Sequence, residues 1–300
     1  MTVSTSNKKL PPLDEIRATI PKECFEKNLL ISTAYLIWDL FLMAVLYKVQ
    51  PYFELGGLIG MVFWYFLVGM IGFSLFVVGH DCGHGTYSNY TTINDIIGNL
   101  THGMLFTPFW PWQKSHRLHH TFTGHLNKDH GHPWITEDTY STWGPTEKFY
   151  ANNVSTAIVR WFMYTIAGVT DGSHFWPGSS LFKNTKERVQ CAVSGTICIL
   201  FATTAYWYFG SFPGFIKFYV LPVLAQGFWL TMVTYLQHQT DDIEVFEDGT
   251  WNYAKLSPLG VYRKETSYDF LWQFASLNAR LRYLVGEGTG KLRYAPAKDD

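Results

Sequence analysis

Two groups of histidines have the residue type and spacing best suited to chemistry. His80 and His84 are four positions apart, as are His116 and His120, and His119 lies beside the second pair. Residues four apart share one face of a helix, so two imidazoles at this spacing can bind one metal ion. The offset His119 can then reach a second metal. The sequence therefore predicts a histidine-rich metal site.

The ligand type narrows the choice of metal. Imidazoles suit zinc, copper, iron or nickel rather than magnesium or calcium. Cys82 is the one thiol close to these histidines in the sequence, which argues against a cysteine-rich zinc site and an iron–sulfur cluster. Iron with coordination positions open to oxygen fits best. His238, at the end of the last apolar stretch, is a further candidate ligand, whereas the isolated His102 and His174 are expected to be hydrogen-bonded structural residues.

Four apolar stretches must position these histidines, and we expect each to be a transmembrane helix. They are residues 29–47, 55–79, 191–216 and 218–237. About 20 apolar residues in a helix are enough to cross a bilayer, and repeated runs of this kind are rare in soluble helical proteins. The spans should form two hairpins, closed by "KVQPYFE" and "GSFPGFIK". Asp39 interrupts the first span and should face other helices rather than lipid.

The distribution of positive charge predicts the orientation of these spans. Of the 23 lysines and arginines, all but Lys48 and Lys217 lie before the first span, after the fourth, or between the second and third. Cytosolic loops carry such an excess, so both termini and residues 80–190 should be cytosolic. The central segment is expected to form a helical cap, with residues 93–110 and 154–170 as helices lying on or dipping into the membrane.

The composition excludes several other classes of protein. Only 16% of the residues are charged, against 47% hydrophobic, and the net charge of −1 gives no reason to expect a nucleic-acid partner. Four scattered cysteines are too few for a disulfide framework. The first 28 residues contain no apolar core, so they do not form a cleaved secretory signal. The fold class expected is an all-α integral membrane protein with a cytosolic helical cap that carries the histidines.

Three short motifs, "HDCGHGTYSN", "WPWQKSHRLHH" and "GHPW", together resemble the membrane fatty acid desaturases. The motif sequences are most similar to those of the animal methyl-end desaturases, which are the omega-6 (delta-12) and omega-3 acyl desaturases. The resemblance runs from about residue 29 to residue 253. It implies a non-haem di-iron centre, with ligands from a first box, a second box and the end of the fourth span. On this chain these ligands are His80, His84, His116, His119, His120 and His238.

The resemblance also implies a reaction and its partners. The enzyme would use O2, with electrons from cytochrome b5, to introduce a double bond toward the methyl end of an unsaturated acyl chain. Its substrate would be an acyl lipid or an acyl-CoA, and its location the endoplasmic reticulum membrane. An acyl hydroxylase or acetylenase on the same scaffold is an alternative. Iron and oxygen would supply the reactivity, and the protein would supply position and exclusion of water.

One family feature is absent from this sequence. The third histidine box, H-x2-HH, is missing, because no histidine follows His238. His125, His130 and His132 are expected to be supporting residues rather than substitutes, while the acids Glu265 and Asp269 remain possible ligands. We therefore expect a cytosolic segment 1–28, a desaturase domain 29–253 truncated before the third box, and an unrelated tail 254–300. Such a chain should bind less than the full iron complement, so a silent isoform that binds acyl lipid or a full-length desaturase is a second alternative.

Overall fold

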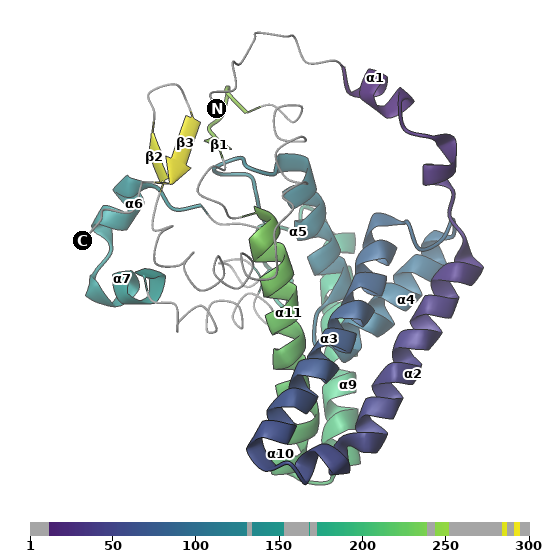
Figure 1. Cartoon of the computed structure of the whole chain (residues 1–300). Coiled ribbons are helices and arrows are strands. Elements are labelled where there is room, and N and C mark those ends of the chain that lie inside the picture. The colour runs from purple at the N-terminus through teal and green to yellow at the C-terminus, as the bar shows by residue number, and fades with distance from the viewer. Residues whose placement is uncertain are drawn as a thin grey trace, which may run out of the picture.

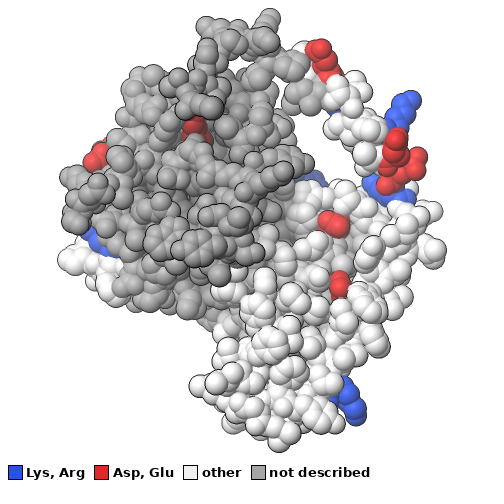
Figure 2. Space-filling model, in the orientation of Figure 1, with Lys and Arg blue, Asp and Glu red and all other residues white. Residues whose placement is uncertain are grey.

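Four long apolar helices dominate the structure. The computed structural model describes residues 12–130, 134–152, 168, 173–238, 244–251, 284–286 and 291–294. Within these residues, four helical segments are long and apolar enough to cross a membrane: Leu29–Glu54, Gly57–His84, Thr185–Phe209 and Phe212–Thr234. The expected four spans and the helical membrane fold are confirmed. Figure 2 shows that the described face of this bundle carries few charged residues.

The first two long helices, α2 (Leu29–Glu54) and α3 (Gly57–His84), are joined by two residues and pack against each other. The Asn28 side chain accepts the backbone N–H of Ile31 at 3.1 Å, which satisfies an amide at the start of α2. Gly57 has a φ of 60°, a conformation that favours glycine. This tight connection lets α3 run back along α2 (Figure 1).

The last two spans differ in their bounds from the prediction. The third, α9 (Thr185–Phe209), begins six residues earlier than expected because the Asn184 side chain accepts the backbone N–H of Glu187 at 3.0 Å. It ends at Phe209 rather than residue 216, because Gly210 adopts a left-handed φ of 69° there. After it come α10 (Phe212–Phe215), a short π-helix η3 (Ile216–Val220) and α11 (Leu221–His238).

Helix α3 lies at the centre of the packing, because it contacts α2, α11, α4 and α5. Its small residues allow close approach: a Cβ added at Gly69 would lie 2.6 Å from the carbonyl carbon of Ala225 in α11. The buried core at the end of the bundle that carries the histidines combines side chains from α2, α3, α5 and the turn before α5. They are Leu36, Leu75, Phe76, Leu105 and Trp112.

The expected helix over residues 93–110 is wrong as a single element. Two helices form instead, α4 (Thr91–Met104) and α5 (Phe109–Phe122). Between them Phe106 has a positive φ of 56°, and Pro108, which has no N–H to donate, stands at the start of α5. The other expected surface helix, 154–170, lies outside the described residues except for Gly168.

Smaller elements complete the described structure. They are α1 (Leu13–Ala18), η1 (Lys22–Phe25), α6 (Glu137–Thr142), α7 (Pro145–Asn152), β1 (Val245–Phe246), β2 (Leu284–Gly286) and β3 (Lys291–Tyr294). The strands form an antiparallel sheet in the order β1-β3-β2, with Val245 opposite Leu292. This small sheet is an addition to the predicted helical fold, and it joins the segment after α11 to the C-terminal tail.

Candidate metal centre

Four of the predicted ligands come together where α3 and α5 meet. His80 and His84 from α3 face His116 and His120 from α5, and one nitrogen from each ring lies within 4.8 Å of the other three. The Nε2 atom of His116 is 3.1 Å from Nε2 of His84 and 3.0 Å from Nε2 of His120. We call these four residues the histidine cluster. Such convergence of imidazole nitrogens is what a bound metal ion requires.

Local structure explains why the two helices meet with their histidines facing. Helix α3 stops immediately after His84, because Gly85 takes a left-handed φ of 71° and its N–H bonds to the carbonyls of the last turn. The side chain of Gln113 in α5 donates to the carbonyl of Gly83 at 3.0 Å, which ties α5 to the end of α3. The Trp112 indole stacks on the His116 ring, with centroids 4.4 Å apart and planes 19° apart.

The electrostatics of the cluster favour neutral imidazoles. Burial, followed by the nearby imidazoles, holds the pKa of His116 far below the usual value for histidine. The same causes lower the pKa of His120 to about 4. A neutral imidazole keeps the lone pair that binds a metal. His80 can donate from Nδ1 to Asp81 Oδ1 at 3.1 Å, which leaves its Nε2 as the ligating atom.

The donor set suits the metals that imidazoles prefer, namely zinc, copper, iron and nickel. The cluster offers four nitrogens and no carboxylate or thiol, a combination that excludes magnesium, calcium and iron–sulfur chemistry. Beside it lies a hollow lined by Gly83, His84, Trp112, Gln113, His116 and Arg117. A site of this kind can bind a redox metal and leave space for a small molecule next to it.

His119 and His238 are not members of the cluster as the structure describes it. The ring of His119 lies 5.6 Å from that of His120, and its Nδ1 is 2.7 Å from a carboxylate oxygen of Asp129. His119 therefore lies beside the cluster, in contact with an acid, and not among the four converging nitrogens. His238 is the last residue of α11, and its side chain lies outside the described residues. Ligation by both residues stays a prediction.

The histidines expected to be structural lie apart from the cluster. His102 is fully buried, stacks on Phe76 at 4.4 Å and bonds to the Phe76 carbonyl at 3.1 Å. Burial is the main cause that lowers the pKa of His102 to about 3. His174 is also buried, at 1% exposed. Both contribute to packing in the described structure.

Among the proposed substitutes for the third box, His125 is held in a structural contact. It is buried, its Nε2 lies 3.1 Å from Asp248, and its Nδ1 accepts the backbone N–H of Asn127 at 3.2 Å. His130 is described but is not part of the cluster. His132, Glu265 and Asp269 lie outside the described residues.

Sequence reasoning missed the polar and aromatic residues that hold the histidines. Trp112 and Gln113 carry no spacing signal of their own, although they directly precede the second histidine group. Asp129 lies ten residues after His119, and Asp248 more than 100 residues after His125. An acid near a histidine motif is a weak signal in a single sequence, because its partner depends on how the loop folds.

Comparisons with known proteins give evidence on the family of this chain. A family model described as "Fatty acid desaturase" matches residues 56–281, which continues beyond residue 253, where the motif resemblance ends. The chain is 46% identical over 270 residues to the Delta(12) fatty acid desaturase fat-2 of Caenorhabditis elegans, covering 85% of this chain and 72% of that protein. It is 43% identical over 248 residues to the Omega-3 fatty acid desaturase fat-1 of the same organism, covering 82% and 62%. A sn-1 acyl-lipid omega-3 desaturase (ferredoxin) of Synechocystis is 32% identical over 269 residues, covering 85% and 73%.

Proposed function

The chain belongs to the fatty acid desaturase family, and on this premise we propose that it introduces a double bond toward the methyl end of an unsaturated acyl chain. The observation that carries the proposal is the histidine cluster, because it lies where the long apolar helix α3 ends. A metal held there is within reach of an acyl chain in the bilayer. The relatives named for delta-12 and omega-3 desaturation support the methyl-end position.

We propose that the histidine cluster holds one iron and that His119 and His238 help to hold a second. When bound, the irons supply the reductive activation of O2 that removes hydrogen from an unactivated methylene pair. Cytochrome b5 is the proposed source of electrons, an acyl lipid or acyl-CoA the substrate, and the endoplasmic reticulum membrane the location. The protein has no nucleic-acid partner in this proposal.

The contribution of the chain's own residues is to position the four histidines. Trp112 stacks on His116 and limits the rotation of that ring. The Trp112 side chain also packs edge-on to Phe76 in the buried core, which anchors this side of the cluster. Gln113 and the end of α3 hold the two ligand helices in register. Together these contacts keep the four nitrogens converged before a metal ion binds, which reduces the entropy lost on metal binding.

A silent membrane protein is a second candidate, because no histidine follows His238 in this sequence. The cluster, His119 and His238 provide six imidazoles, and the described tail strands β2 and β3 contain no histidine. In this alternative the chain binds acyl lipid or a full-length desaturase, and it holds less than two irons.

Product analysis in yeast separates these functions. Yeast expressing the full chain should accumulate new dienoic or trienoic acids if it is a desaturase, and the same chain with His116→Ala should not. Hydroxy acids would identify a hydroxylase, and an unchanged lipid profile with membrane-inserted protein would support the silent form. Iron analysis of the purified chain gives the stoichiometry, and two tightly held irons would reject the incomplete centre.

A further inference from the structure

We propose that Asp129 is a positioning residue that orients the His119 imidazole toward the metal centre, and that residues 244–251 hold the Asp129 loop in place. The inference rests on the proposed function, because it concerns how a ligand of that centre is oriented. We call residues 244–251 the clasp. Three sets of contacts carry the inference: those of the carboxylate, those of its turn, and those of the clasp.

Both oxygens of the Asp129 carboxylate are used. The Nδ1–H of His119 donates to Oδ1 at 2.7 Å, and the backbone N–H of Gly124 donates to Oδ2 at 3.1 Å. The side chains of His119 and Asp129 are 4% and 0% exposed. A carboxylate accepts hydrogen bonds and cannot donate them, so the proton of a neutral His119 is on Nδ1 and its lone pair is on Nε2. Metal-binding histidines are commonly oriented by such a bond from their other nitrogen.

The turn that follows α5 brings Asp129 back to His119. His125 donates its backbone N–H to the Phe122 carbonyl at 2.9 Å, and Asp129 donates its own to the His125 carbonyl at 3.2 Å. Gly124 has a φ of 70°, a conformation that residues with a Cβ rarely adopt. The chain therefore reverses within a few residues of the last histidine of α5.

The clasp fixes this turn from a distant part of the sequence. The backbone N–H of Leu126 donates to the Phe246 carbonyl at 2.9 Å, and that of Phe246 donates to the Gly124 carbonyl at 2.9 Å. The Trp251 indole N–H donates to the Thr123 carbonyl at 3.0 Å. Phe246 is 1% exposed, so its two backbone hydrogen bonds to the turn are shielded from water, which strengthens them.

Two further features extend the clasp. Asp248 contacts the ring of His125 at 3.1 Å and also pairs with Lys128. The clasp begins six residues after the end of α11 at His238. One set of contacts thus joins the helix that carries the second histidine group to the segment after the fourth span. The consequence is that the orientation of His119 depends on residues about 120 positions later.

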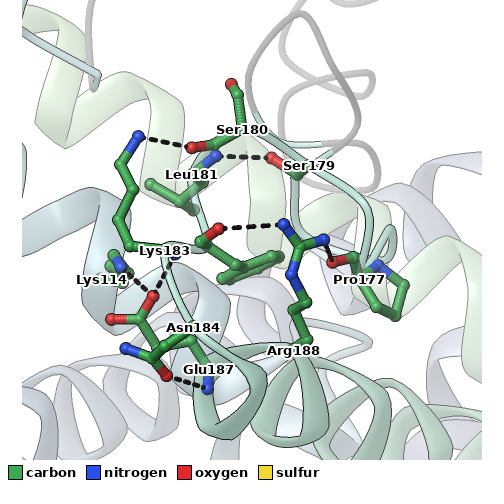
Figure 3. Close-up of polar contacts among 10 residues, drawn as sticks. Lys114, Pro177, Ser179, Ser180, Leu181, Lys183, Asn184, Glu187 and Arg188 are labelled. Carbon is green, nitrogen blue, oxygen red and sulfur yellow. Dashed lines mark hydrogen bonds and ion pairs between the residues drawn. The ribbon is translucent and has the colours of Figure 1, made fainter.

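A second acid that contacts α5 provides a matched control. Glu187 pairs with Lys114 of α5 and accepts the backbone N–H of Lys183 at 2.6 Å, as Figure 3 shows. Its side chain is 25% exposed, and these two partners are lysines rather than histidines. Each of the variants Asp129→Asn and Glu187→Gln replaces an acidic residue that contacts α5 with the corresponding amide residue. Only the first changes a partner of a proposed ligand.

Cobalt(II) titration of the purified full chain in detergent tests the proposal. Asp129→Asn should weaken Co(II) binding about 10- to 100-fold, because one amide cannot accept from both His119 and Gly124. Glu187→Gln should leave Co(II) binding unchanged, and Asp129→Glu should restore part of it. Unchanged binding in Asp129→Asn, or equal weakening in both amide variants, would overturn the assignment.

Nitrogen-15 NMR of the metal-free chain, with labelled histidine, gives a readout that needs neither metal nor turnover. His119 should carry its proton on Nδ1 in the wild type, and its Nδ1 resonance should shift in Asp129→Asn but not in Glu187→Gln. A wild-type His119 with its proton on Nε2 rejects the positioning role. If the NMR and Co(II) results hold while yeast lipids are unchanged, the desaturase proposal fails and the positioning role stands.

Discussion

Two histidines that contact the Trp112 indole occupy different environments. His102 of α4 lies nearly perpendicular to the indole, with ring centroids 4.7 Å apart, and is fully buried. His116 stacks on the same indole at 4.4 Å and faces the rest of the histidine cluster. The two residues share one neighbour, yet Nε2 of His102 bonds to a backbone carbonyl, whereas Nε2 of His116 faces other imidazoles.

The pKa values alone do not separate these two environments. Burial is the main cause of the lowered pKa of both His102 and His116. His102 donates to the Phe76 carbonyl, and among the described residues its Nδ1 has no hydrogen-bond partner. This agrees with a neutral ring held by packing. A lowered pKa therefore does not identify a metal ligand, because a structural histidine shows it too. The convergence of several nitrogen lone pairs is the feature that identifies a ligand.

The largest effect should come from His116→Ala, which removes the nitrogen that lies close to both His84 and His120. We expect metal affinity to fall on the order of 100-fold or more, since loss of a ligand should exceed the 10- to 100-fold effect of losing its hydrogen-bond partner. Co(II) titration measures it, with His102→Ala as the control. Retention of tight binding would remove His116 from the ligand set.

Trp112→Ala should disturb the environments of both His102 and His116. The side chain is 4% exposed and packs against Phe76, His102 and His116. Truncation of a buried tryptophan costs about 3–5 kcal/mol, and loss of the stack should also weaken metal binding. Unfolding of the metal-free protein in detergent measures the first effect and Co(II) titration the second. Trp112→Phe keeps an aromatic ring, so it should lose less stability and less Co(II) affinity than Trp112→Ala. Equal losses of Co(II) affinity in the two variants would show that the stacked ring does not support metal binding.

His102→Ala should give the reverse pattern to His116→Ala. Removal of a fully buried ring leaves a cavity beside Phe76, and we expect the free energy of unfolding to fall by about 2 kcal/mol or more. Metal affinity should stay close to that of the wild type. Thermal unfolding with and without Co(II) measures both quantities. A loss of metal binding as large as that of His116→Ala would contradict the distinction between the two environments.

The smallest effect should be a pH dependence of stability. The pKa of His102 is about 3 in the folded protein and 6.5 ordinarily, so the unfolded chain binds the proton more readily. The stabilising effect of the neutral ring is complete above pH 6.5 and is lost as the pH falls toward 3, by up to about 1.4 kcal/mol per pH unit. Unfolding of the metal-free protein between pH 7.5 and 5 should show this slope added to those of His116 and His120, whose pKa values are lowered as well. His102→Gln should reduce it, and an unchanged slope would assign it to other groups.

The four spans and the two histidine pairs that form the cluster could be predicted from sequence because their signals are local. A run of apolar residues is recognisable wherever it lies, and two histidines four apart share a helix face without help from the rest of the chain. The bounds of α9 were less predictable, because they depend on the Asn184 cap and the Gly210 turn rather than on hydropathy. The break between α4 and α5 was missed, although Pro108 marks it.

A membrane protein with a histidine site where its second apolar helix ends can thus be predicted from residue order alone. Tertiary structure alone decided that His80, His84, His116 and His120 converge. It also decided that His119 turns to Asp129, and that residues 244–251 close over the loop between them. The physical reason is distance along the chain. Hydropathy and helical spacing act over a few residues, whereas a buried carboxylate or amide is satisfied by whatever partner the fold brings to it.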